Sequence, residues 1–189
     1  MNDSNKKIAI FAFIFILSAV ILLFAMPRQQ LPPGHDQNAN IAAVDSLNNM
    51  LNARLGELLQ LHGKYPDSTA IMVQLGNVYY DLDNPENAIV FYDMSLKKNP
   101  QDASVLADCA VMYFKTGDSD KALQYLDKAI ELQPDLAQAW FNKGLILMTA
   151  KDRHQEGLEV WRHFIKLAPE SQEAKLIKSQ IDAIEAGQG

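Results

Sequence analysis

The sequence predicts an all-α protein, a solenoid of helical hairpins behind a single N-terminal transmembrane helix. Four prolines follow one another at intervals of 34, 34 and 35 residues: Pro66, Pro100, Pro134 and Pro169. This period is the length of one helix–turn–helix repeat. Between the prolines, small and bulky residues recur in step with the same period. The third observation is an apolar, uncharged stretch at residues 8–26.

Residues 8–26 are predicted to be an uncleaved membrane anchor. The segment has one polar side chain, Ser18, and nineteen residues at a helical rise cover about the thickness of a bilayer core. The alternative is a cleaved signal peptide, which has a shorter apolar core and a small-x-small cleavage site. The best candidate for that site offers Leu23 and Ala25 before Pro27, which fits it poorly.

Charges on either side of the anchor indicate its orientation. Lys6 and Lys7 precede it and Arg28 follows it, so residues 1–7 are expected to form a short cytoplasmic head. We therefore expect a single-pass protein of the bacterial inner membrane, with its N-terminus in the cytoplasm and its repeats in the periplasm. The proline-rich, polar residues 27–39 are predicted to be a linker.

Residues 40–65 are predicted to form an N-terminal packing helix. Six leucines recur there at helical spacing: Leu47, Leu51, Leu55, Leu58, Leu59 and Leu61. The short connection to the repeats favours packing against the first of them. The alternative is a free amphipathic helix that pairs with another copy of the chain.

Residues 69–169 are predicted to form three helical hairpins. Asn84 suits an N-cap and Pro85 the first helical position, where no amide donor is needed. Gly117 suits the left-handed residue that closes a helix. The six helices are expected near residues 69–82, 85–98, 103–116, 119–132, 137–150 and 154–167.

The recurring residues resemble the tetratricopeptide repeat (TPR) family. The stretches Val73–Tyr79 and Ala139–Gly144 follow its aromatic, Leu-Gly, aromatic pattern. Small residues that let two helices approach closely recur with bulky residues beside them. The small set is Gly76, Ala110 and Gly144, and the bulky set is Tyr92, Leu126 and Trp161. The resemblance implies a stacked scaffold that binds other proteins.

The third hairpin departs from this pattern. It has one extra residue within 151–155, and Phe164 stands where the earlier units have Ser95 and Ala129. A large ring at this position is expected to push the next helix away or to pack on a different partner. Residues 170–186 are predicted to form an amphipathic capping helix.

Composition argues against binding of nucleic acid. Residues 35–189 hold 14 Lys and Arg against 22 Asp and Glu, a net charge of −8, which disfavours nucleic acid.

The single cysteine, Cys109, is expected to be a buried core residue. The four histidines are His35, His62, His154 and His163; they lack metal-ligand spacing and most are expected to be solvated. We therefore expect no enzyme activity, catalytic residue, metal or cofactor.

The TPR resemblance implies a peptide-binding groove along the first helix of each hairpin. A TPR subgroup clamps a terminal carboxylate there with Lys and Asn; this chain keeps Asn77 but has Val73 and Asp108 at clamp positions. An apolar, partly aromatic trough remains, suited to an amphipathic helix or an apolar segment. The alternative is that some of these residues pack the interior. The predicted groove comprises Val73, Asn77, Tyr80, Asp81, Ala107, Val111, Phe114, Lys115, Phe141, Leu145, Met148 and Thr149.

Two stretches resemble the membrane-anchored TPR proteins of bacterial c-type cytochrome maturation. They are Ala103–Ala110 and Gly157–Arg162, the latter continuing through Leu167–Pro169 to Glu173–Lys175. That resemblance implies a chaperone-like factor that holds an apocytochrome during heme attachment. The alternative is a structural adaptor that joins subunits of a cell-envelope assembly.

Overall fold

The computed structural model describes residues 37–149 and 153–186. Within these ranges the chain has eight helices and no strand. The predicted head, anchor and most of the linker lie outside the described residues, and no described helix is both long and apolar enough to cross a membrane. The helices are α2 (Gln37–Lys64), α3 (Thr69–Asp81), α4 (Pro85–Lys98), α5 (Ala103–Lys115), α6 (Ser119–Leu132), α7 (Ala137–Thr149), α8 (His154–Leu167) and α9 (Gln172–Ala186).

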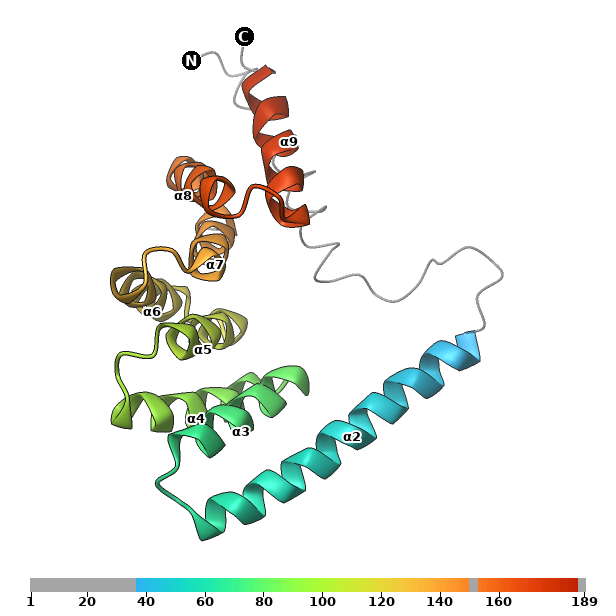
Figure 1. Cartoon of the computed structure of the whole chain (residues 1–189). Coiled ribbons are helices and arrows are strands. Elements are labelled where there is room, and N and C mark those ends of the chain that lie inside the picture. Colours follow the sequence, from blue (N-terminus) through green and yellow to red (C-terminus); the bar gives the residue numbers. More distant parts are fainter. Residues whose placement is uncertain (1–36, 150–152, 187–189) are drawn as a thin grey trace.

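The helices stack as hairpins along a curved array, which confirms the predicted all-α solenoid. The pairs α3–α4, α5–α6 and α7–α8 pack together, and each hairpin packs on the next. In Figure 1, α3, α5 and α7 line the inner side of the curve, and α4, α6 and α8 line its outer side. The first helices of successive hairpins therefore share one continuous surface.

Local sequence signals place the ends of these helices. The side chain of Asn84 accepts a hydrogen bond from the backbone N–H of Asn87, and Pro85 opens α4 as predicted. Gly117, between α5 and α6, has φ +89°. This left-handed conformation costs glycine little because it has no Cβ. The corresponding turn between α3 and α4 has Asp83 at φ 54°.

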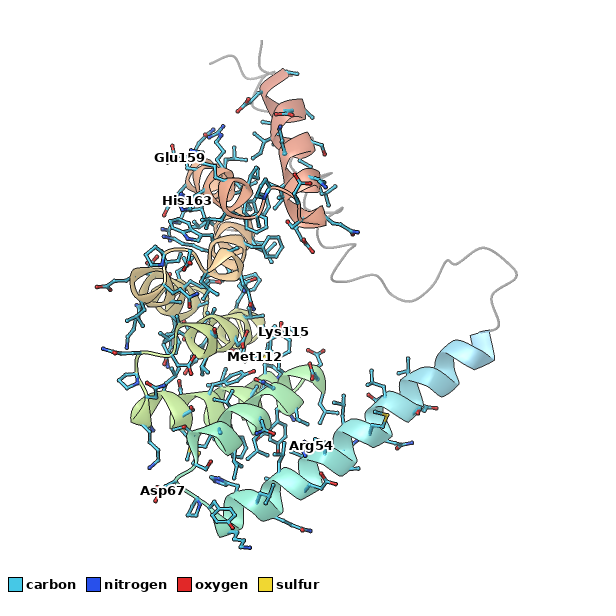
Figure 2. All side chains as sticks on the ribbon, viewed as in Figure 1. Arg54, Asp67, Met112, Lys115, Glu159 and His163 are labelled. Carbon is cyan, nitrogen blue, oxygen red and sulfur yellow. The ribbon has the colours of Figure 1, made fainter. Side chains whose placement is uncertain are left out.

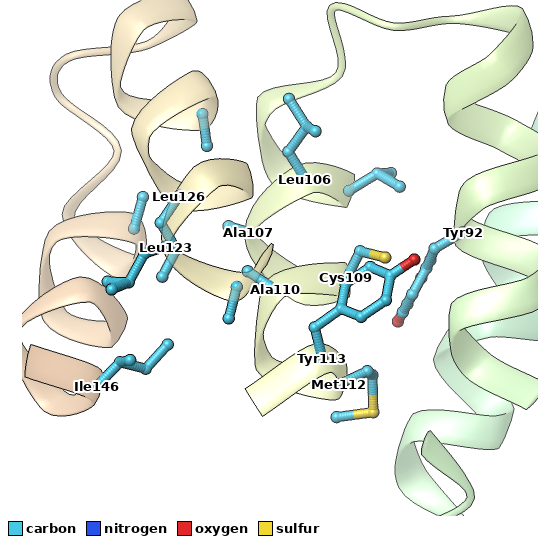
Figure 3. Close-up of a cluster of buried hydrophobic side chains, with 14 of the residues drawn as sticks. Tyr92, Leu106, Ala107, Cys109, Ala110, Met112, Tyr113, Leu123, Leu126 and Ile146 are labelled. Atoms are coloured by element: carbon cyan, nitrogen blue, oxygen red, sulfur yellow. The ribbon is translucent and has the colours of Figure 1, made fainter. Parts of the chain in front are cut away.

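Close approach at glycine fixes the packing within two of the hairpins. A Cβ on Gly76 would lie 2.5 Å from ring carbons of Tyr92, and one on Gly144 would overlap the indole of Trp161. In the middle hairpin, Ala110 and Leu126 are fully buried. Figure 3 shows this central cluster between the helices. The pairing of small and bulky residues predicted from the repeat is confirmed.

Helix α2 packs on the first hairpin over part of its length. Leu58 is buried against Leu75 and Val78 of α3, with Leu51 and Leu55 beside them. This contact confirms the predicted packing of this helix on the first repeat. At 28 residues, however, α2 is much longer than the 13-residue α3, and Figure 1 shows it projecting away from the array.

Phe164 determines the packing at the end of the array. Its ring is buried with Ala174 and Ile177 of α9 and lies 5.3 Å from the ring of Phe141. Of the two outcomes expected for this large side chain, packing on a different partner is therefore the one observed. The buried face of α9 matches the capping helix predicted for this segment.

Candidate functional site

The surface of α3, α5 and α7 on the inner side of the curve is the candidate binding site, and we call it the inner face. Three successive hairpins contribute to it, and α5 and α7 contact each other directly. Figure 2 shows Lys115 near the end of α5 on this side, while His163 and Glu159 lie on the outer side. The inner face is therefore a surface assembled by stacking.

The inner face is apolar at its centre. Tyr80 and Phe114 are half-buried against the main core cluster, and Phe141 and Leu145 are half-buried against the cluster around Phe164. Each of these side chains is partly packed and partly open to solvent. Both interpretations of the trough, interior packing and ligand contact, thus apply to the same residues.

Two residues of the predicted groove are core residues. Ala107 is 0% exposed and Met148 is 3% exposed. Their neighbours close over them, so a ligand reaches neither unless the packing changes. The other ten keep part of their surface open: Val73, Asn77, Tyr80, Asp81, Val111, Phe114, Lys115, Phe141, Leu145 and Thr149.

Polar groups connect one hairpin to the next across the inner face. Lys115 Nζ lies 2.5 Å from Asp83 Oδ1 and 5.7 Å from the centre of the Tyr80 ring. Gln138 on α7 donates a 3.0 Å hydrogen bond to Asp108 Oδ1 on α5. These contacts bridge the first hairpin to the second and the second to the third.

Asp108 stands at the position where the carboxylate-clamp TPR proteins are expected to have Asn. Burial raises the pKa of its carboxyl group, and the carboxylate of Asp102 adds to the rise, while the Gln138 hydrogen bond lowers it. Asp108 and Asp81 in turn help burial to raise the pKa of Tyr80. Two carboxylates, Asp108 and Asp81, therefore act electrostatically on the Tyr80 phenol.

A cluster around Asp93 was not predicted from the sequence. The Asp93 carboxylate accepts hydrogen bonds from Tyr113 Oη at 2.6 Å and Tyr125 Oη at 2.8 Å. Lys121 Nζ lies 4.1 Å from the centre of the Tyr113 ring. The three hydrogen-bonded residues come from α4, α5 and α6, so the cluster ties two hairpins together. Only the folded arrangement brings them together, since 20 and 32 residues separate the tyrosines from Asp93.

The same cluster accounts for Cys109. Its side chain is 0% exposed, and Sγ lies 3.8 Å from Asp93 Oδ1. Burial raises the pKa of the thiol, and the neighbouring Asp93 carboxylate raises it further. Because the reactive form of cysteine is the thiolate, this thiol is a structural group. The expectation of a buried core residue is confirmed.

The three described histidines, His62, His154 and His163, are each half-buried, which differs from the expectation that most of the histidines are solvated. His62 is half-buried with its ring 5.7 Å from the Phe91 ring, and the ring of His163 lies 3.9 Å from that of Trp140. The His62 ring meets Phe91 edge-on, and the His163 ring is tilted against that of Trp140. Among the described residues, no group of three or more His, Cys, Asp and Glu side chains could hold a metal ion.

Comparison with known proteins identifies the repeats. Residues 69–102 match the family described as tetratricopeptide repeat, and residues 111–150 match the family described as TPR repeat. These two segments are tetratricopeptide repeats. The repeats matched are those that form α3 to α7.

Two curated TPR relatives have names that concern chaperones or assembly. The chain is 29% identical over 98 residues to the Hsp70-Hsp90 organizing protein of Triticum aestivum, covering 52% of this chain and 17% of that protein. It is 31% identical over 90 residues to the photosystem I assembly protein Ycf3 of Acaryochloris marina (strain MBIC 11017), covering 40% of this chain and 54% of that protein. This TPR chain thus spans about half of Ycf3 and a smaller part of the organizing protein.

Solved TPR structures have the same fold. A crystal structure of MamA aligns with a TM-score of 0.64 at 18% identity, covering 75% of this chain and 86% of that chain. The first TPR of Spaghetti (RPAP3) bound to the HSP90 peptide SRMEEVD aligns with a TM-score of 0.56 at 19% identity, covering 62% and 93%. At this identity the likeness concerns the TPR fold alone.

Proposed function

We propose that this chain is a membrane-anchored TPR protein that captures segments of other proteins on its inner face. One observation supports the proposal: the first helix of each of the three hairpins carries a half-buried aromatic side chain, namely Tyr80, Phe114 and Phe141. Partly open aromatic side chains beside a rigid core are suitable anchors for an apolar partner. The function is binding, performed by the TPR scaffold.

The preferred client is an apocytochrome held during c-type cytochrome maturation. The resemblance of Ala103–Ala110 and Gly157–Arg162 to TPR proteins of that process supports this choice. The names of the curated relatives support a role in chaperoning or assembly more generally. The inner face would hold an amphipathic helix of the client by its apolar side. The protein would then act as a chaperone-like factor.

The location proposed for this work is the periplasmic side of the bacterial inner membrane. The uncharged segment 8–26 and the lysines before it support an anchor with the repeats outside. A fusion of alkaline phosphatase after Gly189 tests this topology, because the enzyme folds only after export. Activity in cells is expected, and an inactive but stable fusion would contradict the proposal.

A peptide-binding assay tests the function. The full-length chain in detergent is titrated with labelled peptides from the C-termini of apocytochromes, with micromolar binding expected. Phe114→Ala should weaken binding about tenfold, or about 1.4 kcal/mol, because an aromatic anchor is lost. Leu132→Ala is the matched control, since Leu132 is an exposed apolar residue at the end of α6 in the outer layer.

The second candidate function is a structural adaptor in an envelope assembly. The continuous surface of stacked hairpins favours it equally, because such a surface also suits a permanently bound helix. A stable stoichiometric complex from membranes, together with no binding of apocytochrome peptides, would support the adaptor and reject the chaperone.

A further inference from the structure

The inner face carries carboxylates that no cation of the described chain neutralises. Asp108 is half-buried, its hydrogen-bond donor is the uncharged amide of Gln138, and no described Lys or Arg forms an ion pair with it. Removing a carboxylate from water costs free energy that a nearby cation offsets. Asp108 is therefore an unmatched charge on the binding surface.

Asp81 lies one hairpin earlier and adds to this charge. It is exposed at the end of α3 and, among the described residues, forms no ion pair. Both carboxylates act electrostatically on the same phenol, that of Tyr80. The aromatic centre of the inner face is thus flanked by negative charge on two hairpins.

Lys115, a cation on the inner face, is already paired. Lys115 Nζ lies 2.5 Å from Oδ1 of Asp83, a residue in the turn after α3. The same Nζ lies near the Tyr80 ring. Figure 2 shows Lys115 on the inner side of the curve. The positive charge of Lys115 is balanced by Asp83 within the protein. Asp81 and Asp108 therefore make the electrostatic potential that a ligand meets on the inner face negative.

We propose that the inner face selects a partner helix with Lys or Arg next to its apolar anchors, and that it rejects acidic C-terminal peptides. The proposal rests on the proposed function and specifies its partner. Tyr80 and Phe114 would receive the apolar side chains, and the partner's cation would lie against Asp108. Like charge opposes the acidic peptide SRMEEVD, which the Spaghetti TPR binds, because its carboxylates would face Asp81 and Asp108.

Two matched peptides test the charge preference on the full-length chain in detergent. Both are about 20 residues long, helical, with the same Leu and Phe face; one has Lys and the other Glu beside that face. The Lys peptide should bind at least about tenfold more tightly than the Glu peptide, and more tightly than SRMEEVD. The ratio should shrink at about 0.5 M salt, because exposed charges are screened.

Substitutions on the inner face show which carboxylates cause the preference for the Lys peptide. Asp108→Asn keeps an acceptor for Gln138 but removes the charge, so the Lys-to-Glu ratio should fall about threefold or more, and further when Asp81→Asn is added. Glu131→Gln is the control for the general negative charge of the protein, because Glu131 is exposed on α6 and is expected to leave the ratio unchanged.

The outcomes separate this proposal from the function on which it rests. Equal binding of the two peptides, with both weakened by Phe114→Ala, would overturn the charge preference and keep the inner face as the binding site. A preference that survives loss of both carboxylates would also overturn it. Failure of every peptide to bind, in this assay and with apocytochrome peptides, would overturn the proposed function as well.

Discussion

Gln138 of α7 holds the carboxylate of Asp108 on α5 with a 3.0 Å hydrogen bond, so one side-chain pair joins two successive hairpins. The pair needs an acceptor at position 108 but does not need its charge. We expect Asp108→Asn to raise the free energy of unfolding at pH 7 by up to about 1 kcal/mol, since the hydrogen bond remains and a half-buried charge is removed. Chemical denaturation measures the change.

The pH dependence of stability shows whether Asp108→Asn stabilises the protein by removing a charge or by changing the packing. Burial raises the pKa of Asp108 in the folded protein, so the folded state takes up this proton before the unfolded state does. The penalty of the charged carboxylate therefore declines as the pH falls through the folded pKa. The advantage of Asp108→Asn should shrink toward about pH 3.5; an advantage that stays constant would contradict this account.

Gly144 should tolerate no side chain, because the Trp161 indole occupies the space of a Cβ. Trp161 is 2% exposed and its Nε1 donates a 3.1 Å hydrogen bond to the Phe141 carbonyl, so it cannot move aside freely. We expect Gly144→Ala to lower the free energy of unfolding by about 1–3 kcal/mol.

Gly56 provides the matched control for that substitution. It lies within α2, and a Cβ there would meet nothing within 4 Å. Gly56→Ala should be neutral or stabilising by up to about 1 kcal/mol, because alanine favours a helix. Similar losses for both variants would show that the helical glycines are not packing sites.

Alkaline pH should destabilise the fold through the tyrosines that share Asp93. Burial, followed by the Asp93 hydrogen bond and charge, raises the pKa of both Tyr113 and Tyr125. Above about pH 10 the unfolded chain loses phenol protons that the folded chain keeps, so stability falls with rising pH. Tyr113→Phe should make this decline less steep; an unchanged slope would remove Tyr113 as a cause.

Cys109 should resist thiol reagents while the protein is folded. Its side chain is fully buried, and its pKa is raised by burial and by Asp93. Reaction with a disulfide reagent is expected to be slow in buffer and complete in denaturant, where the thiol returns to ordinary reactivity. Fast labelling of the native protein would contradict the packing around α5.

The hairpins could be predicted from the sequence because they depend on local and periodic signals. Asn84 and Gly117 determine helix ends through their own backbone and side-chain chemistry. Within a hairpin, the glycine and its bulky partner are separated by nearly the same distance in sequence: 16 residues from Gly76 to Tyr92 and 17 from Gly144 to Trp161. Such features recur at the repeat period, so each repeat supports the prediction of the next.

The finer structure of the inner face could not be predicted in this way. A helical position shows which side a residue takes but not how closely the next hairpin approaches, so the sequence left open which groove residues pack the interior, as Ala107 and Met148 do. The Asp93 cluster joins three helices and follows no repeated pattern. The part of α2 that projects beyond the first hairpin also follows no repeated pattern. Leu47 and Met50 in this part are 53% and 65% exposed.

Site-specific cross-linking tests most directly the claim that a partner helix binds on the inner face. A photoreactive phenylalanine analogue replaces Phe114 in one full-length variant and Leu132 in another, and each is irradiated with the labelled Lys peptide. The account predicts a cross-linked product from position 114 and little or none from position 132 on the outer helix α6. Equal cross-linking at both positions, or cross-linking from position 132 alone, would contradict it.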